Sequence, residues 1–270
     1  MLQRFRIADD FRDAFRRDGV VVLTDLFSAA EAAAVLHDVL RLFELRFGGP
    51  AGSGLDLVLR NYASGTVAWR QCARRMQHSL AAAKMSCKPE LVANLEELGL
   101  AEPMLATFPE MRVDMPNDDH YMQPWHQDWN WGHGSRNAVT FWTALHDVSA
   151  AQGAIEVLPG SHRWGVLPMR EFRDPRRFAI DDPRLREIVA ETAELKCGEC
   201  VLLSDLVVHR SGRNRSAVPR FSCQLRFCDR AEPTFVASGY RVSGGPPPRE
   251  PGRSYAEGTP QLAPAREPAG

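Results

Sequence analysis

The sequence predicts a mostly β protein with helices: a sandwich or barrel of antiparallel sheets, braced by an N-terminal helical part. Two observations support this fold class. The first hundred residues carry helical patterns, and from about residue 108 the chain turns into short segments rich in β-branched and aromatic residues. Many short strands with few helices between them are typical of antiparallel sandwiches and barrels. Helices that precede the strands place a helical layer on one side of the β core.

The first elements are a short strand and a long helix. Residues 20–26, VVVLTDL, form a β-like run. Ser28 and Glu31 follow at the spacing of a capping box, in which the two side chains satisfy unpaired N–H groups at a helix start. From there to about Phe47 apolar residues recur at helical spacing, which predicts one continuous helix.

Two more helices are predicted near 67–83 and 89–98, and Gly99 suits the end of the second. The strands come next, each a short segment bounded by turn-forming residues. They are expected in MRVDM (111–115), AVTFWTALHDV (138–148), AIEVLP (154–159), CVLLSDLVVH (200–209) and RFSCQLRFC (220–228).

The chain is expected to form one domain over residues 1–244, with its helical part at about 1–100. Residues 245–270 contain seven prolines and few apolar groups. Such a segment buries too little surface to offset the entropy lost on ordering. A flexible C-terminal tail is therefore expected.

Composition excludes several classes of partner. Hydrophobic residues make up 44% of the chain and the net charge is −1, so no general attraction to nucleic acid or an anionic membrane is expected. No apolar run reaches membrane-spanning length, and the N-terminus lacks the apolar stretch of a signal peptide. The six cysteines are too few for a disulfide scaffold. These features predict a cytoplasmic protein.

The densest chemistry lies in the segment QPWHQDWNW, which contains His126 and Asp128. On a strand, positions i and i+2 point to the same face, so the imidazole and the carboxylate would project side by side. His209, at the end of an apolar strand, is the best candidate for a third ligand. Two histidines and one carboxylate around open positions are typical of non-haem Fe(II) oxygenases.

Arg220 strengthens this interpretation. It follows His209 by eleven residues and begins the next strand-like run. A dicarboxylate co-substrate needs a cation at its far end, and arginine offers a planar fork for bidentate carboxylate binding. Ser211 is placed to donate a further hydrogen bond to the same carboxylate.

Other histidines and cysteines offer alternative sites. His146 and His162 are rival ligands, and a substrate-lining role for either stays open. Cys197 and Cys200 form a CxxC that could bind zinc or cycle its redox state, with two later cysteines completing a thiolate site. Those two are five residues apart and would face opposite sides of one strand, which favours buried structural thiols.

Several motifs, in order, resemble the phytanoyl-CoA dioxygenase-like branch of the 2-oxoglutarate oxygenases. FRRDGVVVLTDLFSAAE resembles the opening strand and helix of the family, and WHQD its HxD motif. TFWTALHDVSAAQGAIEVLPGSHRWG resembles its most recognisable stretch. CGECVLLSDLVVHRSGRNRS and PRFSCQLRF resemble its distal histidine and arginine segment. The resemblance runs from about residue 10 to about residue 230.

The resemblance implies a double-stranded β-helix, also called a jelly roll and similar to the cupins, with N-terminal helices bracing one sheet. It also implies residue roles. An iron triad would comprise His126, Asp128 and His209; the C5 carboxylate of 2-oxoglutarate would pair with Arg220, helped by Ser211; and Arg112 would lie near the co-substrate.

The implied chemistry uses Fe(II), 2-oxoglutarate and O2, oxidises a small-molecule substrate and releases succinate and CO2. Related halogenases lack the carboxylate ligand, so Asp128 favours hydroxylation. Substrate-lining roles are predicted for Trp129, Trp131 and Gln127. The alternative is a non-catalytic or zinc-type jelly-roll protein that binds a metal or a ligand. The sequence leaves the substrate and the oligomeric state open.

Overall fold

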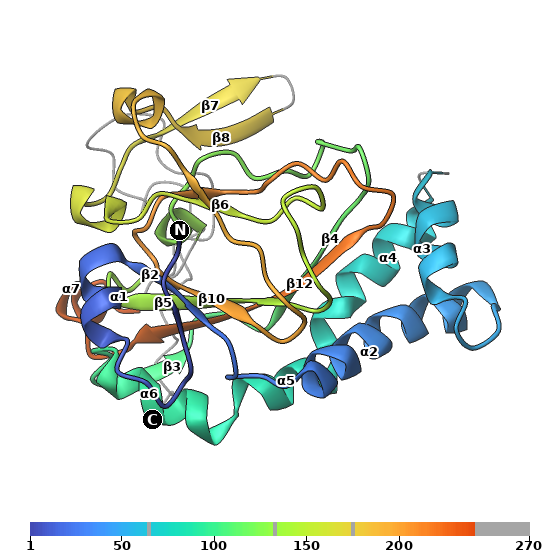
Figure 1. Ribbon diagram of the computed structural model, residues 1–270, viewed down its shortest axis with the longest axis horizontal. Coiled ribbons are helices and arrows are strands. Elements are labelled where there is room, and N and C mark those ends of the chain that lie inside the picture. Colours follow the sequence, from blue (N-terminus) through green and yellow to red (C-terminus); the bar gives the residue numbers. More distant parts are fainter. Residues whose placement is uncertain (64–65, 132–133, 174–175, 241–270) are drawn as a thin grey trace, which may run out of the picture.

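A seven-stranded sheet forms the centre of the structure, a computed structural model that describes residues 1–63, 66–131, 134–173 and 176–240 (Figure 1). Its first pair of strands is parallel, and the other described pairs are antiparallel. The strands lie in the order β1 (Arg4–Phe5), β2 (Val20–Leu23), β10 (Cys200–Ser204), β5 (Ala138–Ala144), β12 (Arg220–Asp229) and β3 (Pro103–Leu105), and β4 (Glu110–Asp114) also pairs with β12.

Two smaller sheets accompany it. One is three-stranded and consists of β11 (His209–Arg210), β6 (Glu156–Val157) and β9 (Glu191–Thr192). The other is a hairpin of β7 (Met169–Arg173) and β8 (Arg176–Ile180). In Figure 1, β6, β7 and β8 lie above the large sheet, and α2, α5 and α6 lie below it.

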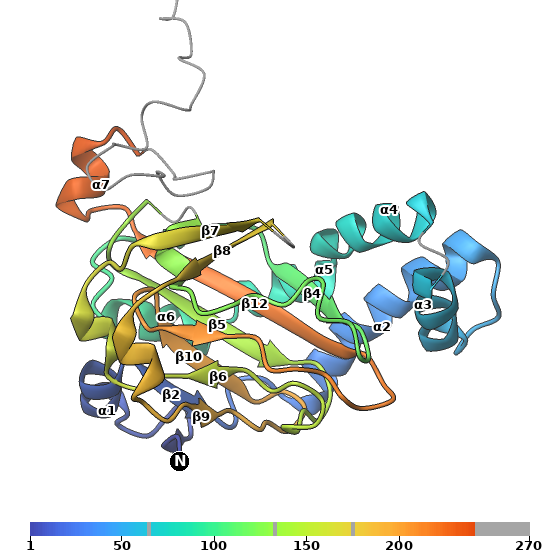
Figure 2. The same ribbon diagram turned by 90° about the horizontal axis from the view of Figure 1, so that it is seen from above.

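Most helices belong to the N-terminal part, as the sequence predicted. The described helices are α1 (Arg12–Asp18), α2 (Ala29–Phe47), α3 (Gly54–Ala63), α4 (Val67–Arg75), α5 (Leu80–Ser86), α6 (Pro89–Glu97) and α7 (Pro233–Ala237). Figure 2 shows α3 and α4 extending to one side of the strands.

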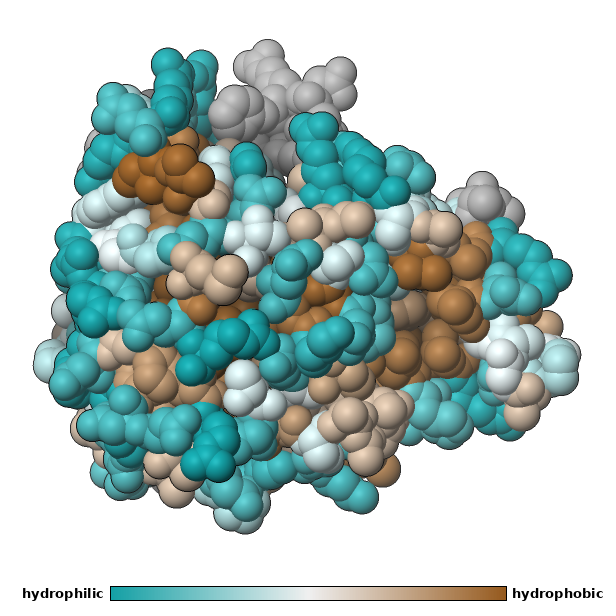
Figure 3. All heavy atoms as spheres, viewed as in Figure 1, coloured by the Kyte–Doolittle hydropathy of each residue, from teal (hydrophilic) through white to brown (hydrophobic). Residues whose placement is uncertain are grey.

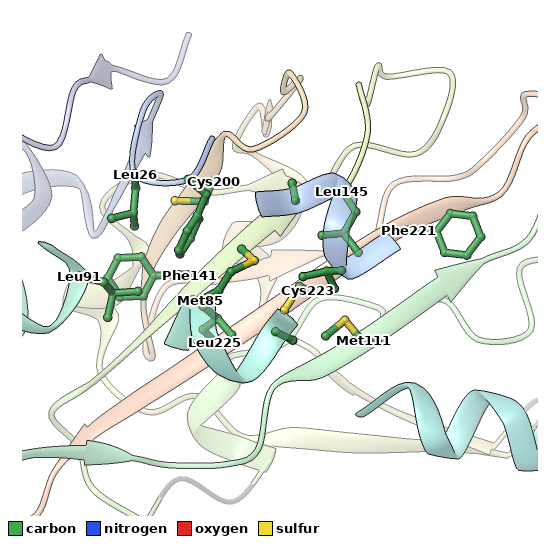
Figure 4. Close-up of a cluster of buried hydrophobic side chains, with 14 of the residues drawn as sticks. Leu26, Met85, Leu91, Met111, Phe141, Leu145, Cys200, Phe221, Cys223 and Leu225 are labelled. Carbon is green, nitrogen blue, oxygen red and sulfur yellow. The ribbon is translucent and has the colours of Figure 1, made fainter. Parts of the chain in front are cut away.

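Alternation along the strands of the large sheet divides the hydrophobic core in two. Phe141 and Leu225 point to the helical side, where they join the core that includes Val35 and Val39 of α2 (Figure 4). Trp142, one residue further along β5, belongs to the core on the other side, with the second sheet. Successive side chains of a strand face opposite sides of the sheet, so β2, β5 and β10 each contribute to both cores.

The start of α2 confirms the predicted capping box. The Ser28 hydroxyl accepts a hydrogen bond from the Glu31 N–H, and the Glu31 carboxylate accepts one from the Ser28 N–H. Gly99 ends the segment after α6 with φ of 97°, a left-handed conformation that glycine adopts without a steric penalty.

The single helix predicted over 67–83 is wrong. The chain forms α4, a short 3-10 turn over Met76–His78, and then α5. Ser79 breaks the run because its backbone is extended and its hydroxyl caps α5 by accepting from the Ala82 N–H. The same hydroxyl donates to Asp38 of α2 at 2.7 Å, which fixes the break against the long helix.

The strand predicted over 200–209 is also two elements. The chain leaves the large sheet after Ser204, turns, and enters the small sheet at His209. His209 therefore begins a strand in the second sheet and does not end one in the first. The predicted tail, 245–270, lies outside the described residues.

The face seen in Figure 3 is largely hydrophilic, with hydrophobic side chains gathered over α3 and α4. Within the described part of the chain, no helix has both the length and the apolar character needed to cross a membrane.

Candidate metal centre

Reciprocal backbone hydrogen bonds hold the two predicted histidine ligands together. The His126 N–H donates to the His209 carbonyl at 2.9 Å, and the His209 N–H donates to the His126 carbonyl at 3.0 Å. The two imidazole rings lie 4.1 Å apart between centroids. An isolated bridge between residues far apart in the sequence thus sets the spacing of the two side chains.

Asp128 completes the cluster, but not from a strand. It begins a 3-10 turn over Asp128–Trp131 directly after the bridge at His126, so the strand geometry predicted for this segment is wrong. Its Oδ1 lies 3.7 Å from Nε2 of His126 and 3.7 Å from Nε2 of His209. One ligand atom from each residue lies within 4.8 Å of the other two, and their exposed fractions are only 5%, 2% and 6% in chain order.

The orientation of both imidazoles is fixed by backbone carbonyls. Nδ1 of His126 lies 2.7 Å from the Pro124 carbonyl, and Nδ1 of His209 lies 3.1 Å from the Val207 carbonyl. A carbonyl can only accept, so each Nδ1 carries the proton and donates it. Nε2 of each ring faces the Asp128 carboxylate, so it is the nitrogen that would bind a metal.

The surroundings also keep His126 uncharged. Burial, assisted by the neighbouring His209, lowers the pKa of His126 to about 3. The metal-binding form of histidine is the neutral imidazole, so this ligand is ready to bind over the physiological pH range. Two imidazole nitrogens and a carboxylate oxygen around one point fit the donor set of Fe(II) in non-haem oxygenases.

Two residues that sequence reasoning missed hold the second oxygen of Asp128. Thr140 of β5 donates its hydroxyl to Asp128 Oδ2 at 2.7 Å, and Nε of Arg226 in β12 lies 3.5 Å from the same oxygen. Arg226 is also paired with Glu110 of β4 at 2.5 Å. Burial alone would lower the pKa of Arg226, but Asp128 and Glu110 outweigh it and raise that pKa.

Arg220 and Arg112 meet beside the cluster and share one carboxylate. Asp114 of β4 accepts from Arg220 at 2.5 Å and from Arg112 at 2.9 Å. Burial alone would raise the pKa of Asp114, but the two guanidinium groups outweigh it and lower the pKa to about 2. Arg220 also donates to the Gly153 carbonyl and lies over the Trp142 ring. Two cations with one shared anion leave a net positive charge at this end of the site.

A pocket opens over the cluster and gathers most of the predicted site residues. Ser211 lies in its wall, where its hydroxyl accepts from the Gln123 N–H at 3.1 Å. The residues that line the pocket are Arg112, Gln123, His126, Asp128, Thr140, Trp142, Ile155, Leu203, His209, Arg210, Ser211, Arg220, Gln224 and Arg226.

Gln127, which was predicted to line a substrate site, is not among the residues that line the described pocket. Its side chain is fully buried. Its amide donates to the carbonyls of Gly165 and Leu206 and accepts from the Leu167 N–H. Gln127 therefore fastens neighbouring loops to the ligand segment.

Of the two tryptophans predicted to line the substrate site, the structure describes the side chain of Trp129. Trp129 is half-buried, is not among the residues that line the described pocket, and donates its backbone N–H to the Asp205 carbonyl at 3.2 Å. The side chain of Trp131 lies outside the described residues.

The rival ligands lie away from the cluster. His146 accepts from the Phe221 N–H through Nε2 at 2.9 Å, and His162 contacts the Arg16 carbonyl through Nε2 at 3.1 Å. The cysteines are all free, and burial raises the pKa of Cys223 to about 12. Among the described residues, the triad is the one group of histidine, cysteine and carboxylate side chains close enough together to share a metal ion.

A second pocket lies between the helices and the loop before the ligand segment. Asp118 in this loop accepts a hydrogen bond from the Tyr62 hydroxyl of α3, and the carbonyl of Tyr121 accepts from Arg112 at 2.8 Å. The same loop therefore borders both pockets. The second is lined by Tyr62, Thr66, Trp69, Arg70, Asp118, His120 and Tyr121.

The sequence profile of the phytanoyl-CoA dioxygenase (PhyH) family matches residues 15–222. Among curated relatives, the dioxygenase FUM3 of Gibberella moniliformis is 29% identical over 39% of the chain, and phytanoyl-CoA dioxygenase 1 of Oryza sativa subsp. japonica is 34% identical over 33%. The matched segment covers 32% of each of these two proteins. The multifunctional dioxygenase prhA of Penicillium brasilianum matches more fully, with 22% identity over 81% of the chain and 72% of that protein.

Solved structures show the same fold. EctD from S. alaskensis, in complex with 2-oxoglutarate and 5-hydroxyectoine, superimposes with a TM-score of 0.56 at 22% identity, over 84% of this chain and 78% of that one. The epimerase SnoN, in complex with Fe3+, α-ketoglutarate and nogalamycin RO, gives a TM-score of 0.55 at 24% identity, over 84% of this chain and 87% of that one.

Proposed function

Because the chain belongs to the phytanoyl-CoA dioxygenase family, we propose that it is an Fe(II)- and 2-oxoglutarate-dependent dioxygenase that hydroxylates a small molecule. The observation that carries the proposal is the convergence of His126, Asp128 and His209 on one point. We infer that the large and small sheets together form the double-stranded β-helix typical of such enzymes. The similarity to EctD and SnoN supports this inference.

The charges of the pocket suit the co-substrate. Arg112 and Arg220 share the carboxylate of Asp114, so two guanidinium groups face one shared anion in this part of the pocket. Displacing Asp114 from one edge of the Arg220 guanidinium would let the C5 carboxylate of 2-oxoglutarate take its place. The Ser211 hydroxyl, in the same pocket, would donate to that carboxylate, since hydroxyls both donate and accept.

An iron(II) ion held by the triad would supply a chelating site for the 2-oxo acid and a position for O2, and the balanced reaction converts substrate, 2-oxoglutarate and O2 to hydroxylated substrate, succinate and CO2. The residues of the chain would bind the metal ion and the co-substrate and orient them. The backbone carbonyls behind His126 and His209 orient both imidazoles with Nε2 toward the metal position, and the buried walls limit the access of water.

The substrate is proposed to be a small molecule that enters over the metal centre. EctD and SnoN were each crystallised with such a compound. Asp128 supplies the carboxylate ligand, so we propose hydroxylation and not halogenation. A cytoplasmic location is proposed because the six cysteines are free.

The test measures succinate formed from 2-oxoglutarate by the purified full chain with Fe(II), O2 and ascorbate, over a panel of candidate substrates. We expect slow succinate release without substrate, faster release with a productive one, and none from His209→Ala. His162→Ala is the matched control, because His162 lies away from the cluster. No succinate under any condition from a protein that binds Fe(II) would contradict the proposal.

The alternative, a non-catalytic or zinc-type metal protein, makes a different prediction. A zinc enzyme has no use for a dicarboxylate co-substrate, so its activity would survive Arg220→Lys. Binding of 2-oxoglutarate that depends on both metal and Arg220 favours the oxygenase, and calorimetry with Mn(II) in place of Fe(II) measures that binding without turnover.

A further inference from the structure

One of the two carboxylate oxygens of Asp128 contacts side chains that are not part of the metal triad. Asp128 Oδ2 accepts from the Thr140 hydroxyl at 2.7 Å and lies 3.5 Å from Nε of Arg226. Its Oδ1 faces the Nε2 atoms of both ligand histidines at 3.7 Å. The two oxygens of one carboxylate therefore have separate partners.

The sheet places these two side chains at one spot. Arg226 of β12 and Thr140 of β5 are directly paired across the strands, so their side chains project together on the pocket side. Thr140 is 1% exposed, and Arg226 is anchored at its far end by Glu110. Neither group can move away from Asp128 without breaking a buried polar contact.

We propose that Thr140 and Arg226 are positioning residues that keep Asp128 a one-oxygen ligand of the iron. This inference rests on the proposed function. An octahedral ion with three protein donors has three positions left, two for the chelating 2-oxo acid and one for O2. A carboxylate that turned both oxygens to the metal would occupy the last of these. The contacts of Oδ2 with Thr140 and Arg226 therefore keep one coordination position of the iron open for O2.

The test counts the waters on bound Mn(II) by water-proton relaxation in the full chain. In the native protein, addition of 2-oxoglutarate should reduce three metal-bound waters to one. Thr140→Val removes the shorter of the two contacts on Oδ2. We therefore expect the relaxivity of the Mn(II) complex to fall by about a third, and the complex with 2-oxoglutarate to lose nearly all its bound-water contribution. Arg226→Lys, which keeps the charge but loses the planar fork, should give a partial change.

Two further variants serve as controls. Thr140→Ser restores the hydroxyl and should restore the native relaxivity. Thr143→Val removes a second buried threonine hydroxyl from the same strand, one without a hydrogen-bond partner among the described residues, and should leave the relaxivity unchanged.

The outcomes separate the two proposals. Native relaxivity in a folded, Mn(II)-saturated Thr140→Val protein overturns the positioning role and leaves the proposed function intact. Failure of the native chain to bind Mn(II), or to lose waters on addition of 2-oxoglutarate, overturns both. If Arg226→Lys does not fold, the comparison of Thr140→Val with Thr140→Ser still decides.

Discussion

At the scale of single residues, the most informative contact is the shared carboxylate between Arg220 and Arg112. Asp114 accepts a hydrogen bond from one end of the Arg220 guanidinium, so the proposed binding of 2-oxoglutarate is an exchange of one carboxylate for another. An exchange of this kind depends on the flat geometry of arginine, because two parallel N–H groups can present to a carboxylate at once.

Arg220→Lys is therefore expected to raise the KM for 2-oxoglutarate by about 10- to 100-fold, the equivalent of about 1.5–3 kcal/mol for a charge-assisted hydrogen bond. Lysine retains the charge that Asp114 needs, which limits the loss of stability. Steady-state succinate assays measure the change. Arg215→Lys, an exposed ion pair with Asp119, is the control, and an equal effect there would refute the assignment.

The low pKa of Asp114 predicts an acid-sensitive contribution to stability. The pKa of this residue is about 2 in the folded chain and about 3.9 when unfolded. The unfolded state therefore binds the proton first, so the contribution is complete above pH 4 and is lost as the pH falls from about 4 to 2. It is on the order of 2 kcal/mol.

Denaturant unfolding of the metal-free protein between pH 5 and 2.5 measures this effect. Asp114→Asn should be less stable than the native chain near pH 5, and the difference should shrink as the pH falls. A difference that is independent of pH would show that Asp114 is not the titrating group.

Sequence reasoning found the residues whose chemistry is rare and missed those whose chemistry is common. His126, Asp128 and His209 stood out because few side chains bind transition metals, and the structure brings them together. Thr140 and Arg226 gave no such signal, since threonine is common in strands and arginine on surfaces. The one available clue was the even spacing of Arg226 from Arg220, which places both on one face of a strand.

At the scale of elements, the predicted local geometry was wrong where long-range contacts decide it. The ligand segment was expected to be a strand, but only His126 forms a bridge and the chain then turns at Asp128. The nine residues of the ligand segment contain no pattern that indicates a backbone bridge to His209, some eighty residues later in the chain. The capping box before α2 was predictable because its hydrogen bonds join residues three apart.

Gln127 connects the ligand segment to two loops, so its replacement should destabilise the fold. Gln127→Leu would remove the hydrogen bonds to two half-buried carbonyls and to the buried Leu167 N–H, at a cost of about 2 kcal/mol. Thermal unfolding measures the loss, with the exposed Gln3→Ala as control. A stable Gln127→Leu protein with altered substrate kinetics would instead support the original substrate-lining prediction.

The capping box offers a milder test at the same scale. Ser28→Ala removes the hydroxyl that caps α2 and should cost about 1 kcal/mol, a decrease in Tm of about 2–4 °C for a chain of this size. Ser28→Thr keeps the hydroxyl and should unfold near the native temperature. Succinate formation should be unaffected in both, because α2 lies on the helical side of the sheet (Figure 1).

At the scale of the whole molecule, alternating strands explain why the fold class was predictable. Apolar residues recur on both faces of β5 and β10, so a helical layer and a second sheet are both needed to cover them. The hairpin of β7 and β8 was not anticipated, because its charged sequence, MREFR and RRFAI, lacks the alternation of a half-buried strand.

Metal binding should stabilise the fold, since the ligands come from β11 of the small sheet, from His126 bridged to it, and from the 3-10 turn that begins at Asp128. Cobalt(II) at 100 times its Kd is expected to raise the free energy of unfolding by about 2.7 kcal/mol, provided that the unfolded chain does not bind it. Differential scanning fluorimetry with and without a chelator detects this as a shift in Tm. The shift should disappear in His209→Ala, and its persistence there would place the ion elsewhere.

The backbone bridge between His126 and His209 has one more consequence, for how the protein handles its ion over time. Because main-chain hydrogen bonds set the separation of the two imidazoles, departure of the ion does not require the site to come apart. Loading should then be rapid and need no chaperone-assisted rearrangement. A protein purified with the wrong divalent ion should recover through simple dialysis and exchange, without a cycle of unfolding and renaturation.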